Sequence, residues 1–378
     1  MKQLADTVWI VDQAKAIGFD LCGVVRADKF PELEKSPEWL DRGYAGEMKY
    51  LADPRRSDLE AVLPGVRSAV VCLLSYNTDW PLSTNAAARM EDEEPRGWIS
   101  RYAWGKDYHD VLCEKLRTLA ELLHNRYCEP FEARAYVDTG PIPERVLAKY
   151  AGLGWLGKNT LLLNHMLGSF FFLGVLLTTL DLEPTLAPHE LPPPDLCGSC
   201  RQCLDACPTQ AFVEPYVLDA RKCISYLTIE LRSSIPEEFR EPMGNHVFGC
   251  DICQDVCPWN RRAPVSTLEA FQPRVISRHN GQESEPFDQG DDDSLFLPRL
   301  EWLGGLDETE FRKVFRTSPI KRAKWRGLIR NACNALGNAR LSRGTATHAR
   351  IMEVLERLSA STDSMIAESA HWALSRIQ

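Results

Sequence analysis

Eight of the thirteen cysteines lie between residues 197 and 257, and no other feature constrains the fold as strongly. The first four, Cys197, Cys200, Cys203 and Cys207, follow the spacing C-x2-C-x2-C-x3-C-P. Bacterial ferredoxins bind 4Fe–4S clusters with this run, and its fourth cysteine is a ligand of the second cluster. The spacing therefore predicts two clusters and a partner run further along the chain.

The partner run has the spacing C-x2-C-x3-C-P and holds three cysteines, while a further cysteine lies alone between the two runs. The crossing of the runs assigns Cys197, Cys200, Cys203 and Cys257 to cluster one, and Cys207, Cys250, Cys253 and, by elimination, Cys223 to cluster two. Zinc ribbons and free thiols are the alternatives, but zinc leaves the third close cysteine and both Cys-Pro pairs unexplained. Two such clusters would conduct single electrons.

The other five cysteines are scattered singly, and we expect them to be small buried hydrophobic residues: Cys22, Cys72, Cys113, Cys128 and Cys333. The net charge of −9 excludes a uniformly basic surface but allows a local basic patch. No apolar run approaches the roughly 18 residues of a membrane span, and Asp6 and Asp12 argue against a signal peptide. We therefore expect a cytoplasmic monomer without membrane contact.

The chain's 378 residues suffice for two or three domains, and the expected fold class is a multidomain α+β protein. Residues 1–190 are predicted to form an α/β domain, with helices near residues 4–17 and 111–123. Short apolar runs predict its strands at Leu21–Val25, Ala69–Leu74 and Phe170–Leu177.

After a proline-rich linker at residues 185–195, a ferredoxin-like domain is expected over residues 191–262. Residues 261–294 read as a loop, and their acidic end from Glu283 to Asp293 is expected to be solvated. Residues 295–378 are predicted to form a helical, HEAT-like domain.

A glycine-rich stretch, Gly152-Leu-Gly-Trp-Leu-Gly-Lys158-Asn159, contains G-x-G-x-x-G and nearly matches a P-loop. A dinucleotide-binding fold requires a strand before these glycines, whereas residues 144–151 predict a helix. In a P-loop, Ser or Thr stands where this chain has Asn159. The remaining interpretation is a tight turn whose amides and Lys158 could hold a phosphate or amide group.

Upstream, a predicted strand ends at Asp138 and a helix is expected to begin near Pro143. Asp138 is therefore either a turn residue or an acid at a ligand-binding edge of the sheet, and the local pattern does not choose between them.

These residues, the motif Arg101-Tyr-Ala-Trp-Gly-Lys-Asp-Tyr108-His109, the eight cysteines and residues 223–230 together resemble epoxyqueuosine reductases, relatives of the cobalamin-dependent reductive dehalogenases. The resemblance implies cobalamin and two 4Fe–4S clusters as cofactors. It implies reduction of epoxyqueuosine in a tRNA anticodon loop to queuosine, the last step of queuosine biosynthesis. Residues 1–190 would then cradle cobalamin, and the C-terminal helices would help to hold the tRNA.

The resemblance also places the catalytic acid on Asp138, and it implies cobalamin contacts at Arg56, Tyr108, Asp138, Lys158, Asn159 and Ser225. Asp107 and His109 begin a D-x-H-x-x-G cobalamin motif, but Leu112 replaces its glycine, so we expect His109 to be packed or hydrogen-bonded rather than bound to cobalt. Removing an epoxide oxygen as water takes two electrons and two protons. An ordinary Asp, with a pKa near 3.9, is a poor proton donor at neutral pH unless burial raises its pKa.

From Arg316 to Arg350 the sequence has nine Lys and Arg residues and no Asp or Glu. Phosphate contact is the favoured interpretation and a solvated helix face is the alternative. The tRNA contacts predicted here are Lys321, Arg322, Lys324, Arg326 and Arg330. An external electron donor is also implied. The alternative functions are a reductive dehalogenase-like corrinoid enzyme and a two-cluster electron carrier.

Overall fold

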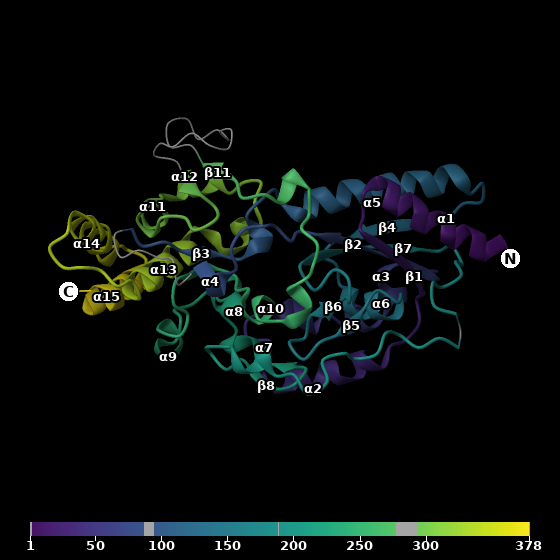
Figure 1. Cartoon of the computed structure of the whole chain (residues 1–378), viewed down its shortest axis with the longest axis horizontal. Coiled ribbons are helices and arrows are strands. Elements are labelled where there is room, and N and C mark those ends of the chain that lie inside the picture. The colour runs from purple at the N-terminus through teal and green to yellow at the C-terminus, as the bar shows by residue number, and fades with distance from the viewer. Residues whose placement is uncertain (1, 87–93, 188, 277–292, 378) are drawn as a thin grey trace.

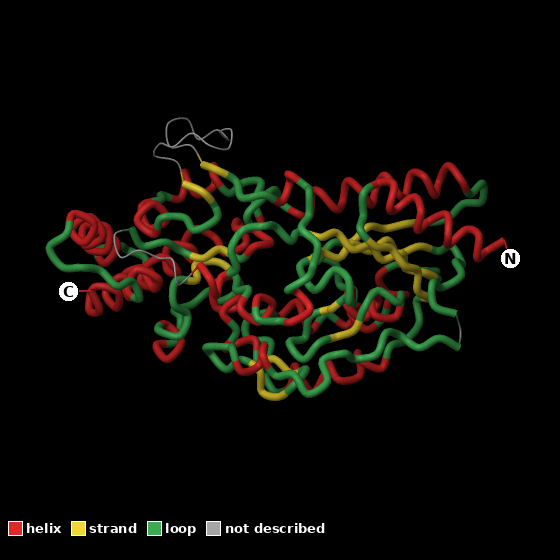
Figure 2. Tube along the Cα trace, in the orientation of Figure 1, coloured by secondary structure: helices red, strands yellow, loops and turns green. Residues whose placement is uncertain are grey.

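The computed structural model describes residues 2–86, 94–187, 189–276 and 293–377. A sheet with its covering helices occupies one end of the elongated molecule, and the C-terminal helices occupy the other (Figure 1). The cysteine-rich segment lies between these ends, and Figure 2 shows its short helices and long loops. The N- and C-termini lie at opposite ends.

The main sheet has four strands in the order β1-β2-β7-β4, and every neighbouring pair is antiparallel. The strands are β1 (Leu21–Arg26), β2 (Ser68–Ser75), β7 (Phe171–Thr178) and β4 (Ala133–Tyr136). The three strands predicted from apolar runs are confirmed. The expected α/β character of residues 1–190 is corrected to α+β, because α/β sheets are built from parallel strands joined by crossover helices.

Helices cover both faces of this sheet, which explains why every residue of β2 is buried. Val70, Cys72 and Leu74 pack against α1 (Lys2–Ile17) and α5 (Tyr108–Arg126). The alternate residues of β2 pack against α6 (Glu144–Tyr150) and α3 (Leu59–Val62) on the opposite face. Since side chains alternate along a strand, a strand covered on both faces reads as a continuous apolar run.

The cysteine-rich segment is built from short elements joined by loops. They are α7 (Gln202–Asp205), β8 (Phe212–Glu214), β9 (Val217–Leu218), α8 (Ile224–Ile229), α9 (Glu237–Arg240), β10 (His246–Phe248) and α10 (Ile252–Asp255). In each cysteine run the final Cys-Pro pair follows one short helix, α7 or α10. The two runs therefore have matching local folds, as their shared spacing predicts.

The C-terminal helices are α11 (Leu300–Gly305), α12 (Glu308–Val314), α13 (Lys324–Gly337), α14 (Ala346–Ser359) and α15 (Ser364–Ile377). These helices match the helical residues predicted there. Helix α15 packs on α13 so closely that a Cβ on Gly337 would lie 2.5 Å from the Trp372 ring. Within the described ranges, no helix combines the length and apolar character that a membrane span requires.

The C-terminal helices share one hydrophobic core with two distant segments of the chain. Strand β3 (Trp98–Ile99) pairs in parallel with β10, and Trp98, Trp104 and Phe248 pack in the core of α11–α15. The predicted division at residues 190, 262 and 295 remains a prediction, but its parts are joined by this shared core.

Two further expectations concern single residues. Asp293, at the end of the segment predicted to be solvated, is fully buried and bonds Arg299, so that prediction is wrong for Asp293, while residues 277–292 lie outside the described ranges. Asp293 belongs to β12 (Asp293–Ser294), which pairs with β11 (Val275–Ile276). Among the scattered cysteines, Cys22, Cys72 and Cys333 are buried as expected, whereas Cys113 is only half-buried and Cys128 is exposed.

The remaining short elements are α2 (Ser36–Asp41), α4 (Ser83–Ala86), β5 (Trp155–Leu156) and β6 (Leu162–Leu163).

Candidate functional site

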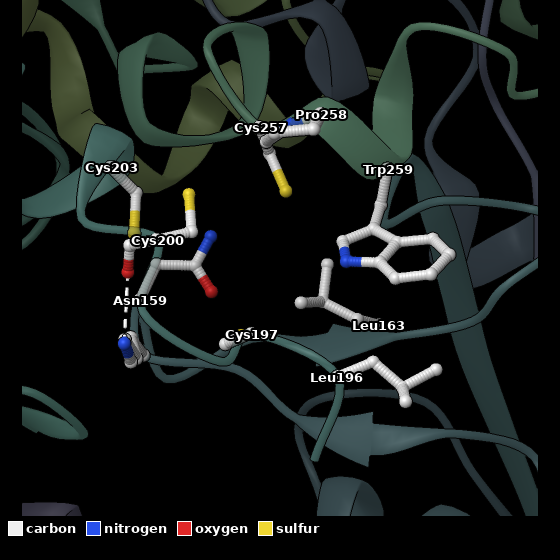
Figure 3. Close-up of a pocket in the computed structure, with 10 residues that line it drawn as sticks. Asn159, Leu163, Leu196, Cys197, Cys200, Cys203, Cys257, Pro258 and Trp259 are labelled. Carbon is white, nitrogen blue, oxygen red and sulfur yellow. Dashed lines mark hydrogen bonds between the residues drawn. The ribbon is translucent and has the colours of Figure 1, made fainter.

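The structure brings the four cysteines assigned to cluster one around a single cavity of about 270 Å³. Figure 3 shows Cys200 and Cys203 from one run facing Cys257 from the other, with Leu163, Leu196 and Trp259 along the apolar side. Burial and the neighbouring Cys257, Cys197 and Cys200 thiolates raise the pKa of Cys203 to about 11. Ionising all four thiols in one cavity would need a compensating positive charge, which the iron of a cluster would supply.

A buried indole beside this cavity also fits a cluster. Trp155 packs with Cys257 and Cys197. Burial raises the pKa of the Cys197 thiol, and a hydrogen bond from the Trp155 indole partly offsets this rise. A donor directed at a cysteine sulfur stabilises the thiolate, which is the form that binds iron.

The four cysteines assigned to cluster two also lie near one another. Burial, followed by the charges of Cys223, Cys203 and Cys207, raises the pKa of Cys253. Burial, followed by the charges of Cys253 and Cys223, raises the pKa of Cys250. Because Cys203 belongs to the first cavity, the two sets of thiols are adjacent.

Cys223 occupies the position before α8, and its thiol accepts hydrogen bonds from the backbone amides of Ser225 and Tyr226. Ser225, predicted as a cobalamin contact, therefore lies beside a cluster-two thiol. Helix N-termini favour thiolates, so this position suits a metal ligand.

The glycine-rich stretch forms a tight hairpin of β5 and β6, in agreement with the turn interpretation. Gly154 has φ +155°, and a Cβ on it would lie 2.1 Å from the Leu163 carbonyl oxygen. The glycines therefore permit close backbone packing. Lys158 donates from Nζ to the carbonyl oxygens of Gly198 and Cys200, the latter at 2.9 Å, and buried Asn159 also lines the cluster-one cavity. Both residues were predicted as cobalamin contacts, and in this structure they hold the cysteine loops.

Asp138 lies on the turn after β4, in the left-handed region with φ +57°. Its backbone N–H donates to Glu144 Oε1 at 2.6 Å, and the Tyr108 hydroxyl donates to its Oδ2 at 2.8 Å. The carboxylate itself is 67% exposed. The protein thus presents Asp138 at an open surface, and any burial of this acid must come from a bound molecule.

Tyr108, at the start of α5, gives Asp138 a rigid support. Its ring stacks on Phe172 with centroids 4.3 Å apart and an interplanar angle of 3°. Burial, together with the Asp138 charge, raises the pKa of Tyr108, so its phenol stays protonated and remains a hydrogen-bond donor.

Glu144, which the sequence analysis missed, is the second acid at this turn. Burial and the Asp138 charge raise its pKa to about 8. Its position at the first turn of α6, six residues after Asp138, is the only sequence signal that could have identified it.

Tyr50 joins three parts of the chain at the edge of this site. The guanidinium of Arg56 lies 5.6 Å from the Tyr50 ring centroid, and that of Arg322 lies 5.5 Å from it. Arg322 also donates two 2.8 Å hydrogen bonds to Glu230, at the end of α8. Arg56, predicted as a cobalamin contact, and Arg322, predicted as a tRNA contact, therefore lie on one aromatic ring.

His109 is hydrogen-bonded, as expected. Its Nδ1 lies 2.7 Å from Asp107 Oδ1, and Lys321 Nζ donates to Asp107 Oδ2 at 2.7 Å. Burial by itself would raise the pKa of Asp107, but the hydrogen bonds from His109 and Lys321 outweigh it and lower the pKa to about 2.

The basic segment is less free than its sequence indicates. Several of its charges are paired with carboxylates distant in sequence: Lys321 with Asp107, Arg322 with Glu230, Arg326 with Asp363 and Arg350 with Glu301. Lys324 is exposed, and no ion pair is found for it within the described residues. Such pairing lowers the charge available to phosphates.

Arg330 does not fit the predicted phosphate contact, because it is fully buried. Its guanidinium donates to the carbonyl oxygens of Leu227 at 2.5 Å, Leu231 at 2.9 Å and Ser233 at 2.6 Å. Arg330 therefore joins α13 to the end of α8, and we withdraw it as a tRNA contact.

Replacing Arg330 with Ala is expected to destabilise the fold, because it leaves three buried carbonyls without their donor. At about 1–3 kcal/mol for each unsatisfied group, the loss is about 3 kcal/mol or more. Thermal unfolding of the anaerobically prepared protein would measure it, with Lys324→Ala as the exposed control. An unchanged midpoint combined with weaker tRNA binding would restore Arg330 as a phosphate contact.

Comparison with known proteins adds to this geometry. Residues 196–260 match the family described as a 4Fe-4S double cluster binding domain, and residues 56–139 match the one described as "Epoxyqueuosine reductase QueG, DUF1730". The epoxyqueuosine reductase of Gloeobacter violaceus is 44% identical to the chain over 339 residues, which cover 87% of this chain and 95% of that protein.

Two solved structures are similar over the whole chain. An epoxyqueuosine reductase crystallised with an epoxyqueuosine-modified tRNA-Tyr stem loop has a TM-score of 0.80 at 30% identity and covers 100% of this chain and 90% of its own. The Bacillus subtilis epoxyqueuosine reductase, whose catalytic aspartate loop is swung out of the active site, has a TM-score of 0.77 at 30% identity, with coverages of 100% and 91%.

Proposed function

The chain belongs to the epoxyqueuosine reductase family and reduces epoxyqueuosine in tRNA to queuosine, and we propose that the electrons pass through two 4Fe–4S clusters to a cobalamin held beside Asp138. The observation that carries this proposal is the meeting of four cysteines from two sequence runs around one cavity, with the other four close by. An arrangement of two adjacent clusters is suited to moving single electrons.

We propose that cluster two is the nearer of the two clusters to Asp138. Gly249 immediately precedes Cys250, and a Cβ on Gly249 would lie 3.5 Å from the Tyr102 ring. The rings of Tyr102 and Tyr108 have centroids 5.9 Å apart, and the Tyr108 hydroxyl bonds Asp138. Cluster one would then lie further from Asp138, beside the half-exposed side chain of Leu196. We therefore place the entry of electrons from an external donor at cluster one and their exit at cluster two.

The donors around Asp138 fit cobalamin by their chemistry. The corrin ring carries amide side chains, which Arg56, Tyr50 and Ser225 can bond, while Tyr108 and Phe172 offer an aromatic support. When bound, cobalamin would supply a low-potential metal centre able to reduce the epoxide. Arg56, Tyr108, Asp138 and Ser225 are proposed to hold it, and so are Lys158 and Asn159, which also bond carbonyl oxygens of the cysteine loops.

The chain's own residues are proposed to manage the protons. Reduction of an epoxide to a double bond consumes two electrons and two protons and releases one water. Asp138 protonates the departing oxygen, Tyr108 orients its carboxylate and Glu144 holds its backbone amide. The exposed position of Asp138 on a left-handed turn also allows its loop to move, as the swung-out loop of the Bacillus subtilis relative does.

The experiment that tests the proposal is anaerobic purification with added cobalamin, followed by absorption spectroscopy, metal analysis and assay on an epoxyqueuosine-bearing stem loop. We expect about eight iron per chain, bound cobalt and conversion to queuosine. A protein that retains its iron but neither binds cobalamin nor converts the stem loop would be an electron carrier, and the proposal would fail.

We propose that exposed basic residues of the C-terminal region hold the tRNA backbone. They include Lys324 and Arg326, and also Lys321 and Arg322 at the edge of the site. Substituting Arg316, Lys324 and Arg340 with Ala removes three exposed charges for which no ion pair is found in the described residues. Each lost phosphate contact should reduce the slope of log affinity against log salt by about one. Binding of the stem loop at several salt concentrations measures this slope.

The matched control replaces Lys15, Lys35 and Arg117, which are exposed on the N-terminal part, with Ala. This variant changes the net charge equally and is expected to keep the wild-type slope. Equal slopes for the two triple variants would mean that the C-terminal charges form a solvated helix face and do not contact tRNA phosphates.

A further inference from the structure

A line of charged side chains joins the C-terminal segment to Asp138. Lys321 Nζ lies 2.7 Å from Asp107 Oδ2, Asp107 Oδ1 lies 2.7 Å from His109 Nδ1, and His109 Nε2 lies 3.9 Å from Asp138 Oδ2. His109 Nε2 is buried and has no hydrogen-bond partner among the described residues. A buried ring nitrogen without a partner, turned toward an acid, calls for an explanation.

We propose that His109 delivers the second proton of the reaction to Asp138. Asp107 and Lys321 fix the orientation of the His109 ring. This inference rests on the proposed function and concerns a step that the cofactors do not supply. His109 acts through Asp138 and does not itself touch the substrate.

The tautomer of His109 follows from its partner. Hydrogen bonds keep Asp107 ionised at neutral pH, so its carboxylate can only accept hydrogen bonds. Nδ1 of His109 must therefore carry a hydrogen and donate it to Asp107. A carboxylate that fixes one ring nitrogen in this way orients the other, which here is directed at Asp138.

The 3.9 Å separation is too long for a hydrogen bond, but Asp138 can close it. Its side chain is mostly exposed and is bonded in the described structure by Tyr108 alone, and its backbone lies on a turn with positive φ. A side-chain rotation that moves Oδ2 by about 1 Å brings it within hydrogen-bond distance of Nε2. The stacking of Tyr108 on His109, with centroids 4.1 Å apart, keeps the imidazole in place during this movement.

The proton balance leaves a role for such a source. A single carboxyl group can carry one proton at a time, whereas the reaction consumes two. In the proposed sequence, Asp138 first protonates the oxygen released by ring opening and becomes a carboxylate. It then takes the Nε2 proton of the His109 imidazolium and passes it to the hydroxyl group, which leaves as water as the carbon–carbon double bond forms. Both electrons come from the reduced cofactors, and half-buried His109 regains its proton from solvent.

The other groups around Asp138 are less suited to this role. Tyr108 is held in its protonated form by burial, and Arg322 and Arg145 are guanidinium ions that do not release protons at neutral pH. Glu144, with a pKa of about 8, is the strongest competitor among the described residues, but it bonds the Asp138 backbone amide rather than its carboxylate. The test must therefore separate His109 from Glu144.

The test measures single turnovers by pre-reduced holoenzyme with saturating epoxyqueuosine-bearing stem loop. His109→Gln is expected to slow the reaction at least about tenfold while stem-loop affinity and the cobalamin and cluster spectra stay unchanged. In His109→Ala, added imidazole should restore much of the rate. The matched control is His124→Gln on the same helix, whose side chain is exposed and stacks on Phe131.

Three results would overturn the inference. They are a His109→Gln rate within twofold of wild type, a slow His109→Ala variant that imidazole does not rescue, and a larger loss in Glu144→Gln than in His109→Gln. Failure of the proposed function is distinguishable from all three, because then the wild-type holoenzyme would not convert the stem loop either.

Discussion

Replacing Asp138 with Asn is expected to slow turnover at least about a hundredfold, the lower range for loss of a general acid. Asn keeps the shape of the side chain and can still accept the Tyr108 hydrogen bond, but it carries no acidic proton. The variant should therefore bind cobalamin, both clusters and the tRNA stem loop like the wild type. Single-turnover assays on pre-reduced enzyme, together with absorption spectra, measure the two effects separately.

Asp110→Asn provides the matched control, because Asp110 is an exposed carboxylate in the first turn of α5, one residue after His109. Its loss changes the charge near the site but removes none of the hydrogen bonds that hold Asp138. Equal rates for the Asp138 and Asp110 variants would reduce Asp138 to an ordinary turn residue.

Replacing Cys223 with Ala is expected to remove cluster two while sparing cluster one. Iron content should fall from about eight to about four atoms per chain, because each cubane holds four. Turnover should fall to background, since the cluster lost is the one proposed to lie nearest Tyr102 and Asp138. Iron analysis and the assay on the stem loop give both numbers.

Cys113→Ala serves as the control, because Cys113 lies in α5 outside the cysteine runs, and its variant should keep full iron content. Full iron content in the Cys223 variant would mean that the assignment of this ligand by elimination is wrong.

The parts of the fold that could be predicted depend on local patterns. Strand β2 is covered on both faces, and its continuous apolar sequence predicts this burial. The sequence does not predict whether β2 and β7 pair in parallel or antiparallel, because an apolar run is compatible with both directions. These two strands are also separated by nearly a hundred residues. The expected α/β domain implies parallel strands, whereas the strands of this sheet are antiparallel.

The candidate site shows the same division. Spacing alone grouped the cysteines, since the crossing of two runs is a geometric rule, and the cavity joins Cys257 to the first run as that rule requires. The contacts of the basic residues could not be read in this way. Lys321 meets Asp107 across 214 positions, and Arg330 meets backbone carbonyls of α8, which no side-chain pattern records.

The core shared by distant segments has a consequence for how the protein is made in the cell. Arg330 and Asn331 of α13 bond the Leu227 and Thr228 carbonyls of α8, the helix that begins directly after Cys223. The same C-terminal helices cover Phe248, two residues before Cys250. All eight cysteines leave the ribosome before α13, so the loops around them lack this support until translation is nearly complete. We therefore expect iron to be delivered late, to a chain whose C-terminal helices have already been made.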